Sequence, residues 1–220
     1  MHGRHTKVRP HHWVAGAIAV LVAVSVGIAG AWFIHAQTDE PTTAGSSSTS
    51  TGAHQLQVCR TVWHSQSDAL AAADRSLQQW RVHVGAMNQL VSGQITLAQA
   101  QAFWNRTRVG AEARVAKFEK AHGAYADVAG RCPGRSSSAS PSRQVRRCLA
   151  GVRARHRAID AGSVAIATWK HHIRAMEMLR SGQLTPQMAT QMWLQSWHLG
   201  VRQLDAFTKA RKHAADAGSC

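Results

Sequence analysis

The stretch WRVHVGAMNQLVSGQITLAQAQAFW, residues 80–104, returns as WKHHIRAMEMLRSGQLTPQMATQMW at residues 169–193. The two segments align without a gap at an offset of 89 residues, and 11 of their 25 positions are identical. Farther out, the same offset pairs Cys59 with Cys148 and Phe118 with Phe207. A repeat at a fixed offset is typical of a duplicated supersecondary unit. The sequence therefore predicts two similar halves, repeat 1 over residues 56–132 and repeat 2 over residues 145–220.

Residues 56–91 carry apolar side chains at alternating steps of three and four, which is the period of one face of a long helix. In that frame ten of eleven positions are apolar, and the frame ends at Val91. The corresponding frame of repeat 2, residues 145–180, is apolar at eight of eleven positions. Both segments are predicted to be long helices whose apolar stripes face a shared core.

Each long helix is followed by a turn and a second helix. Gly93 and Gly182 can take the left-handed conformation that ends a helix. Thr96 then forms a capping box with Gln99, and Pro186 occupies the favoured first position of the next helix. The return helices are predicted to be about 30–36 residues long. They carry Leu97, Ala100, Trp104, Ala111, Phe118 and Tyr125 in repeat 1, and Ala189, Trp193, Gly200, Leu204 and Phe207 in repeat 2.

The stretch between the repeats, residues 130–143, contains five Ser, two Pro and two Gly and is predicted to be a loop. Two helical hairpins joined by such a loop form an antiparallel four-helix bundle. The predicted fold class is all-α, with a duplicated four-helix domain over residues 54–220.

The N-terminal end predicts a membrane anchor. Residues 1–12 are basic and lack acids, and residues 13–34 carry no charge. A helix of 22 residues is about 33 Å long, enough to cross a bilayer core of about 30 Å. The basic flank places residues 1–12 in the cytoplasm and the C-terminal domain outside it. A cleaved signal peptide ending at Ala36 is the alternative, and either reading exports the domain.

Two further features accompany this segment. Residues 35–53 are rich in Ser, Thr and Gly and are predicted to be a spacer between anchor and domain. Small residues recur at steps of four within the span, a pattern that allows close helix–helix contact and a homodimer. These residues are Ala15, Ala19, Ala23, Gly27 and Ala31.

Four cysteines in an exported chain predict two disulfides. Cys59 and Cys132 lie at similar distances from the turn of the first hairpin, and Cys148 and Cys220 repeat this arrangement. The favoured pairs are therefore Cys59–Cys132 and Cys148–Cys220. Because all four are predicted at one end of the bundle, Cys132–Cys148 with Cys59–Cys220 is the alternative.

The chain carries a formal net charge of +15, which implies anionic surroundings or partners. The densest basic run, at the start of the third long helix, contains no acid. Its arginines are Arg143, Arg146, Arg147, Arg153, Arg155 and Arg157. We expect this run to contact anionic lipid or wall polymer, with an ordinary solvated face as the alternative. Specific recognition of nucleic acid is not expected, because the aromatic residues lie on the helix seams.

His83 with Met87, and His172 with Met176, place an imidazole and a thioether on one helix face in each repeat. Such pairs suit copper, and His with Met can ligate haem in a helical bundle. Packing in the core is the favoured interpretation, so no cofactor is expected and copper or haem is the alternative. The same holds for the repeated Trp residues, Trp80, Trp104, Trp169 and Trp193, which are expected in the core.

The sequence shows no catalytic set. It has only 11 acids, and no acid–base pair recurs in both repeats. Glu119-x-x-His122 resembles half of a di-iron ligand set, but Thr208 and Arg211 stand at the counterpart positions. The expected function is that of a membrane-anchored, non-catalytic module outside the cytoplasm.

Overall fold

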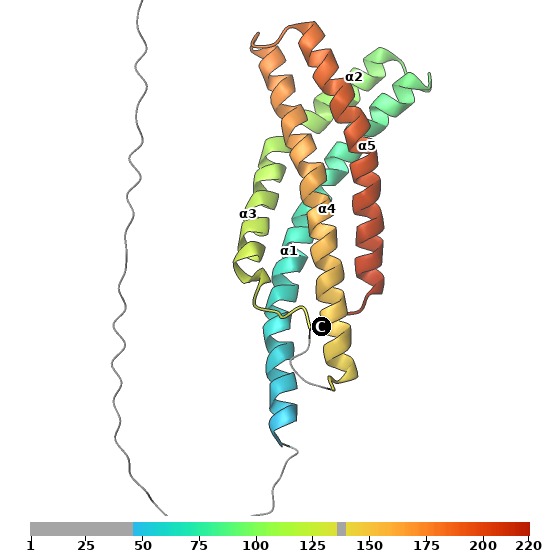
Figure 1. Ribbon diagram of the computed structural model, residues 1–220. Helices are drawn as coiled ribbons and strands as arrows, with labels where there is room; N and C mark the ends of the chain where they lie inside the picture. The colour runs from blue at the N-terminus through green and yellow to red at the C-terminus, as the bar shows by residue number, and fades with distance from the viewer. Residues whose placement is uncertain (1–45, 136–139) are drawn as a thin grey trace, which may run out of the picture. The chain divides into compact units, whose positions relative to one another are not determined.

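Five helices make up the part of the chain that the computed structural model describes, residues 46–135 and 140–220 (Figure 1). They are α1 (Ser46–Val91), α2 (Leu97–Arg108), α3 (Ala111–Ala129), α4 (Arg143–Arg180) and α5 (Pro186–Asp216). No strand occurs within those residues. The prediction of an all-α fold is confirmed.

The two turns lie where the sequence predicts them. Gly93 and Gly182 have φ values of 71° and 73°, in the left-handed region that favours glycine. In each turn the amide following the glycine donates to a carbonyl five residues back, at 2.8 Å, which closes the last helical turn. Thr96 forms the predicted capping box with Gln99, and the Thr185 side chain accepts from the amide of Met188.

The return helix of repeat 1 differs from the prediction, because it is broken between α2 and α3. Gly110 has a φ of 69°, which a helix cannot contain, and Gln79 donates to the carbonyl of Val109 at 2.8 Å. In repeat 2 the same stretch stays helical within α5. The apolar period continues across the break, so it did not reveal the left-handed glycine.

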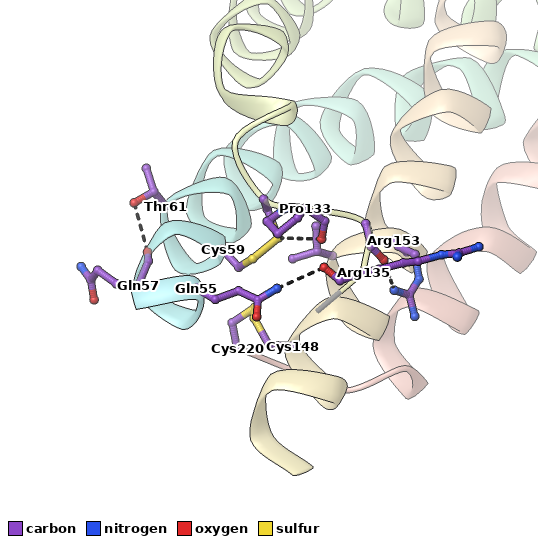
Figure 2. The surroundings of a disulfide bond; sticks show 12 residues. Gln55, Gln57, Cys59, Thr61, Pro133, Arg135, Cys148, Arg153 and Cys220 are labelled. Carbon is purple, nitrogen blue, oxygen red and sulfur yellow. Dashed lines mark hydrogen bonds between the residues drawn. A yellow bond between two sulfur atoms is a disulfide. The ribbon is translucent and has the colours of Figure 1, made fainter. Parts of the chain in front are cut away.

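The start of α1 also differs from the prediction. The helix begins at Ser46, ten residues before Leu56, so residues 46–53 of the predicted spacer are helical. The extended part of α1 and the residues just after it lie against the start of α4 and the loop that precedes it. A Cβ on Gly52 would lie 3.9 Å from the side chain of Val145, and Gln55 donates to the carbonyl of Arg135 at 3.2 Å (Figure 2).

All five helices belong to one compact unit, Thr43–Cys220. They form two hairpins, and each helix packs mainly against the others of its own hairpin. α1 packs against α2 and α3, α4 packs against α5, and α1 against α4 joins the hairpins. Figure 1 shows the two hairpin turns diverging at one end, beyond the point where α1 and α4 cross. Small residues allow the close packing below it, since a Cβ on Gly162 would lie 3.0 Å from the Phe207 ring.

Two disulfides close the opposite end of this arrangement. Cys59 in α1 is bonded to Cys132 after α3, and Cys148 in α4 is bonded to Cys220. Figure 2 shows both bonds close together at this end, which we call the disulfide end. These are the within-repeat pairs that the sequence favoured, and the alternative pairing does not occur.

Among the described residues no helix combines the length and apolar character needed to cross a membrane. The predicted anchor, residues 13–34, and its stripe of small residues lie outside the described residues.

Candidate functional site

The centre of the domain is built from residues that contact their own counterparts in the other repeat. Trp80 stacks on Trp169, with ring centroids 4.7 Å apart and planes 22° from parallel. Nε2 of His83 lies 3.0 Å from Nε2 of His172. Contacts between positions i and i+89 indicate that a rotation axis relates the two repeats, and we describe it as a pseudo-twofold axis. That axis passes between the tryptophans and between the histidines.

A hydrogen-bonded chain orients the two imidazoles. The Thr107 hydroxyl donates to the carbonyl of Phe103 at 2.9 Å, so it accepts from Nδ1 of His83, 2.8 Å away. With the Thr107 proton placed on that carbonyl, we assign the proton of His83 to Nδ1, so that Nε2 of His83 accepts from Nε2 of His172. This assignment leaves Nδ1 of His172 as an acceptor, and it has no hydrogen-bond partner among the described residues.

Burial favours the neutral form of both imidazoles. Each histidine is only 5% exposed. Burial lowers the pKa of His83, with His172 as a second cause, and burial also lowers the pKa of His172, with His171 as its second cause. The site thus offers uncharged nitrogen atoms rather than a positive charge.

Acidification is expected to destabilise the domain through this pair. In the unfolded chain both imidazoles take up a proton as the pH falls through 6.5, whereas the folded protein resists it, so the stabilisation is complete above that pH. The free energy of unfolding should fall by about 1.4 kcal/mol per pH unit below 6.5 for each histidine that stays neutral. Urea unfolding between pH 7.5 and 5 measures the slope. H83N/H172N should flatten it, and replacing the exposed His198 should not; equal slopes in both variants would contradict this assignment.

A cavity of about 410 Å³ lies beside the histidine pair, between the two hairpins. Side chains from α1, α2, α4 and α5 line it, and most of them are apolar. His83, Met87, His172 and Met176, the predicted metal residues, all line this cavity. Trp80, Trp104 and Trp193 line it too, whereas Trp169 packs behind them. The described residues contain no group of three or more His, Cys, Asp or Glu side chains that could hold a metal ion.

No family model, no curated protein and no solved structure matches this chain.

Two polar contacts join the hairpins across the cavity, and they occupy equivalent places about the pseudo-twofold axis. Arg108 pairs with Glu177 at 3.2 Å. At the positions related by 89 residues, the indole of Trp197 donates to Oδ1 of Asn88 at 2.7 Å. We call these the charged clamp and the neutral clamp. Sequence reasoning missed all four residues, because the offset aligns them but their identities differ.

The hydrogen bonds beside the cavity also differ between the repeats. Trp104 donates from Nε1 to the carbonyl of His83 at 3.2 Å. Its counterpart Trp193 makes no such bond, so its Nε1 is buried without a partner among the described residues. Nδ1 of His172 is also buried without a hydrogen-bond partner among the described residues, whereas Nδ1 of His83 is hydrogen-bonded to Thr107. Repeat 2 therefore carries an unused donor and an unused acceptor on two side chains that line the cavity.

The predicted arginine run lies at the disulfide end, and five of its six members are exposed. The exception is Arg155, whose guanidinium lies 3.8 Å from the centre of the Trp63 ring and is partly buried. Arg153 donates to the carbonyl of Gly134 at 2.7 Å, as Figure 2 shows, and Arg146 donates to the carbonyl of Pro141. These bonds hold the guanidinium groups beside the loop. Arg155 is thus better described as a packing residue than as a surface contact.

Proposed function

We propose that residues 54–220 form a non-catalytic binding module that residues 13–34 anchor in the cell membrane, outside the cytoplasm. In this proposal the two repeats are duplicated hairpins of an antiparallel four-helix bundle, with the break at Gly110 as a local departure. The disulfide end of the module contacts an anionic surface, either lipid head groups or a wall polymer.

The arrangement of charge carries this proposal. From Ala53 to Cys220 there are 23 Lys and Arg side chains against 9 Asp and Glu, a net charge of +14. No acid occurs between Asp127 and Asp160, a stretch that contains eight arginines and spans the disulfide end. Guanidinium groups bind phosphate and carboxylate in a bidentate manner, and each adds about 1 kcal/mol near an anionic membrane. The chain also enters α1 at this end, so a tether would bring it to the membrane first.

Binding to anionic vesicles tests the proposal. R146Q/R147Q/R153Q/R157Q, made in a chain of residues 37–220, should bind vesicles of phosphatidylglycerol and phosphatidylcholine about a hundredfold more weakly or worse. Binding by the unchanged chain should fall steeply between 0.1 and 1 M salt, because the Debye length shrinks from about 10 to 3 Å. Co-sedimentation measures both effects.

A matched control removes four exposed arginines elsewhere. R75Q/R106Q/R114Q/R202Q lowers the net charge equally but leaves the disulfide end intact. It should retain most of the binding. Equal losses in the two variants would reduce the effect to net charge, and no loss in the first would make the arginine run an ordinary solvated face. Circular dichroism of both variants checks that the helices persist.

A copper site is the second candidate, and the shared cavity of His83, Met87, His172 and Met176 favours it. Neutral imidazole and thioether are the ligands that suit Cu(I). Metal–nitrogen bonds are about 2.0 Å long, so two imidazoles on opposite sides of an ion lie about 4 Å apart. The observed separation of 3.0 Å is that of a hydrogen bond, which copper or haem would have to open. Anaerobic Cu(I) titration tests this candidate, and the lack of a stoichiometric complex would exclude it.

A further inference from the structure

Two arginines and no acid are among the residues that line the cavity. Arg108 and Arg180 both line the cavity, and both pair with Glu177, at 3.2 and 2.8 Å. One carboxylate cannot occupy the donors of two guanidinium groups, each of which has five N–H bonds. The Arg180 side chain is 67% exposed, so donors remain available on the cavity side of the charged clamp. The neutral clamp, across the cavity, offers no charge.

The interior of the cavity suits a flat apolar body. Indole rings of Trp80, Trp104 and Trp193 and the thioethers of Met87 and Met176 line it. Its volume falls within the range of about 300–1,000 Å³ that is usual for small-molecule sites. Aromatic rings stack on indoles, and methionine adapts its shape to a bound ring.

Some buried polar atoms of the side chains that line the cavity have no hydrogen-bond partner among the described residues. Nε1 of Trp193 and Nδ1 of His172 have no partner among the described residues, and buried polar atoms are normally hydrogen-bonded. Trp80 also lines the cavity, and its Nε1 likewise has no partner among the described residues. The Nε2 atoms of His83 and His172, which a metal would need as ligands, are already hydrogen-bonded to each other. The unused groups are therefore two indole donors and one imidazole nitrogen, which match an organic molecule better than an ion.

We infer that this cavity binds a small amphipathic organic acid, with its ring between the tryptophan and methionine side chains and its carboxylate at Arg108 and Arg180. A carboxylate there accepts charge-assisted hydrogen bonds, whereas an ammonium group meets two like charges. The inference rests on the cavity and is independent of the proposed surface binding.

Three probes of nearly equal shape test the chemical class. The full chain in phospholipid nanodiscs is titrated by calorimetry with 2-naphthylacetate, 2-naphthylethanol and 2-(2-naphthyl)ethylamine, with empty nanodiscs as the blank. The acid should bind with one-to-one stoichiometry and about tenfold more tightly than the alcohol, because hydrogen bonds to charged groups are the stronger ones. The amine should bind most weakly. Equal binding of acid and alcohol, or no binding of the acid, overturns the inference.

Variants test the location. R108Q and R180Q should remove the advantage of the acid over the alcohol, and R106Q is the matched control, because Arg106 is exposed on the same helix but does not line the cavity. N105W places a large ring at an exposed position of the cavity wall and should abolish binding of both probes. Unchanged binding in N105W, or equal effects of R106Q and R108Q, would place the site elsewhere. The quadruple variant of the disulfide end should bind the acid as the parent does, which separates this result from that of the vesicle experiment.

Discussion

Replacing all four cysteines with alanine is expected to lower the free energy of unfolding by about 8 kcal/mol, because each disulfide closes a loop of more than 70 residues and contributes about 4 kcal/mol in the chain-entropy model. Domains of this kind are stable by about 5–15 kcal/mol, so the variant should be largely unfolded at 37 °C. Alanine is the suitable replacement, since Cys59 and Cys148 are 0% and 1% exposed and a serine hydroxyl would be buried there. Urea unfolding followed by circular dichroism measures the change.

The two double variants separate the contributions of the disulfides. C59A/C132A and C148A/C220A should each lose about 4 kcal/mol, because the loops are almost equal in length. If the variant without any cysteine kept its unfolding midpoint, the bonds would not constrain the chain. If the two double variants lost clearly different amounts of unfolding free energy, other contacts would be holding the chain near one of the two disulfides. The hydrogen bond from Arg60 to the carbonyl of Cys220 is one such contact.

Trp80→Ala should be among the most damaging single substitutions, with a loss of about 3–5 kcal/mol. Trp80 is 1% exposed and stacks on Trp169, which is 0% exposed. Its ring also fills the space that Gly200 leaves, since a Cβ there would lie 2.6 Å from ring carbon Cζ2. Removing the indole therefore opens a cavity between α1, α4 and α5 that the helices cannot close.

Trp169→Ala should cost about the same, because the two rings are related by the pseudo-twofold axis. Trp197→Ala is the control, since this ring is partly exposed at the edge of the cavity and should cost clearly less. Chemical unfolding of the three variants at pH 7.5 gives the comparison. A loss below about 1 kcal/mol for Trp80→Ala would mean that the stack contributes little to stability.

The sequence predicted those features of the fold that the duplication repeats. Both turns, the favoured disulfide pairs and the burial of Trp80 and Trp169 follow from a spacing shared by two segments, so each segment supports the other. The break at Gly110 has no counterpart in repeat 2, and a single glycine within an apolar period does not reveal its φ. The helix α1 also begins at Ser46, within residues whose composition alone indicates a loop, and the neighbours of Gly52 and Gln55 could not be read from the sequence.

The candidate site was predictable only in part, for a related reason. His83, Met87, His172 and Met176 could be proposed together because the repeats preserve them, and the structure does place them around one cavity. The clamps could not be found in this way. Asn88 aligns with Glu177, and Arg108 aligns with Trp197, so their pairing depends on the angle between the hairpins rather than on any shared residue type.

One polypeptide that contains both repeats can differ on the two sides of its pseudo-twofold axis, whereas a dimer of two identical chains cannot. A symmetric dimer of identical hairpins would present the same groups on both sides of its axis, because every contact of residue i with residue j would recur as a contact of j with i. The cavity at the centre of such a dimer would carry identical groups on its two sides. Covalent linkage of the repeats removes that constraint, and here one side carries arginine and glutamate where the other carries tryptophan and asparagine. The fused chain can therefore carry different groups on the two sides of its axis.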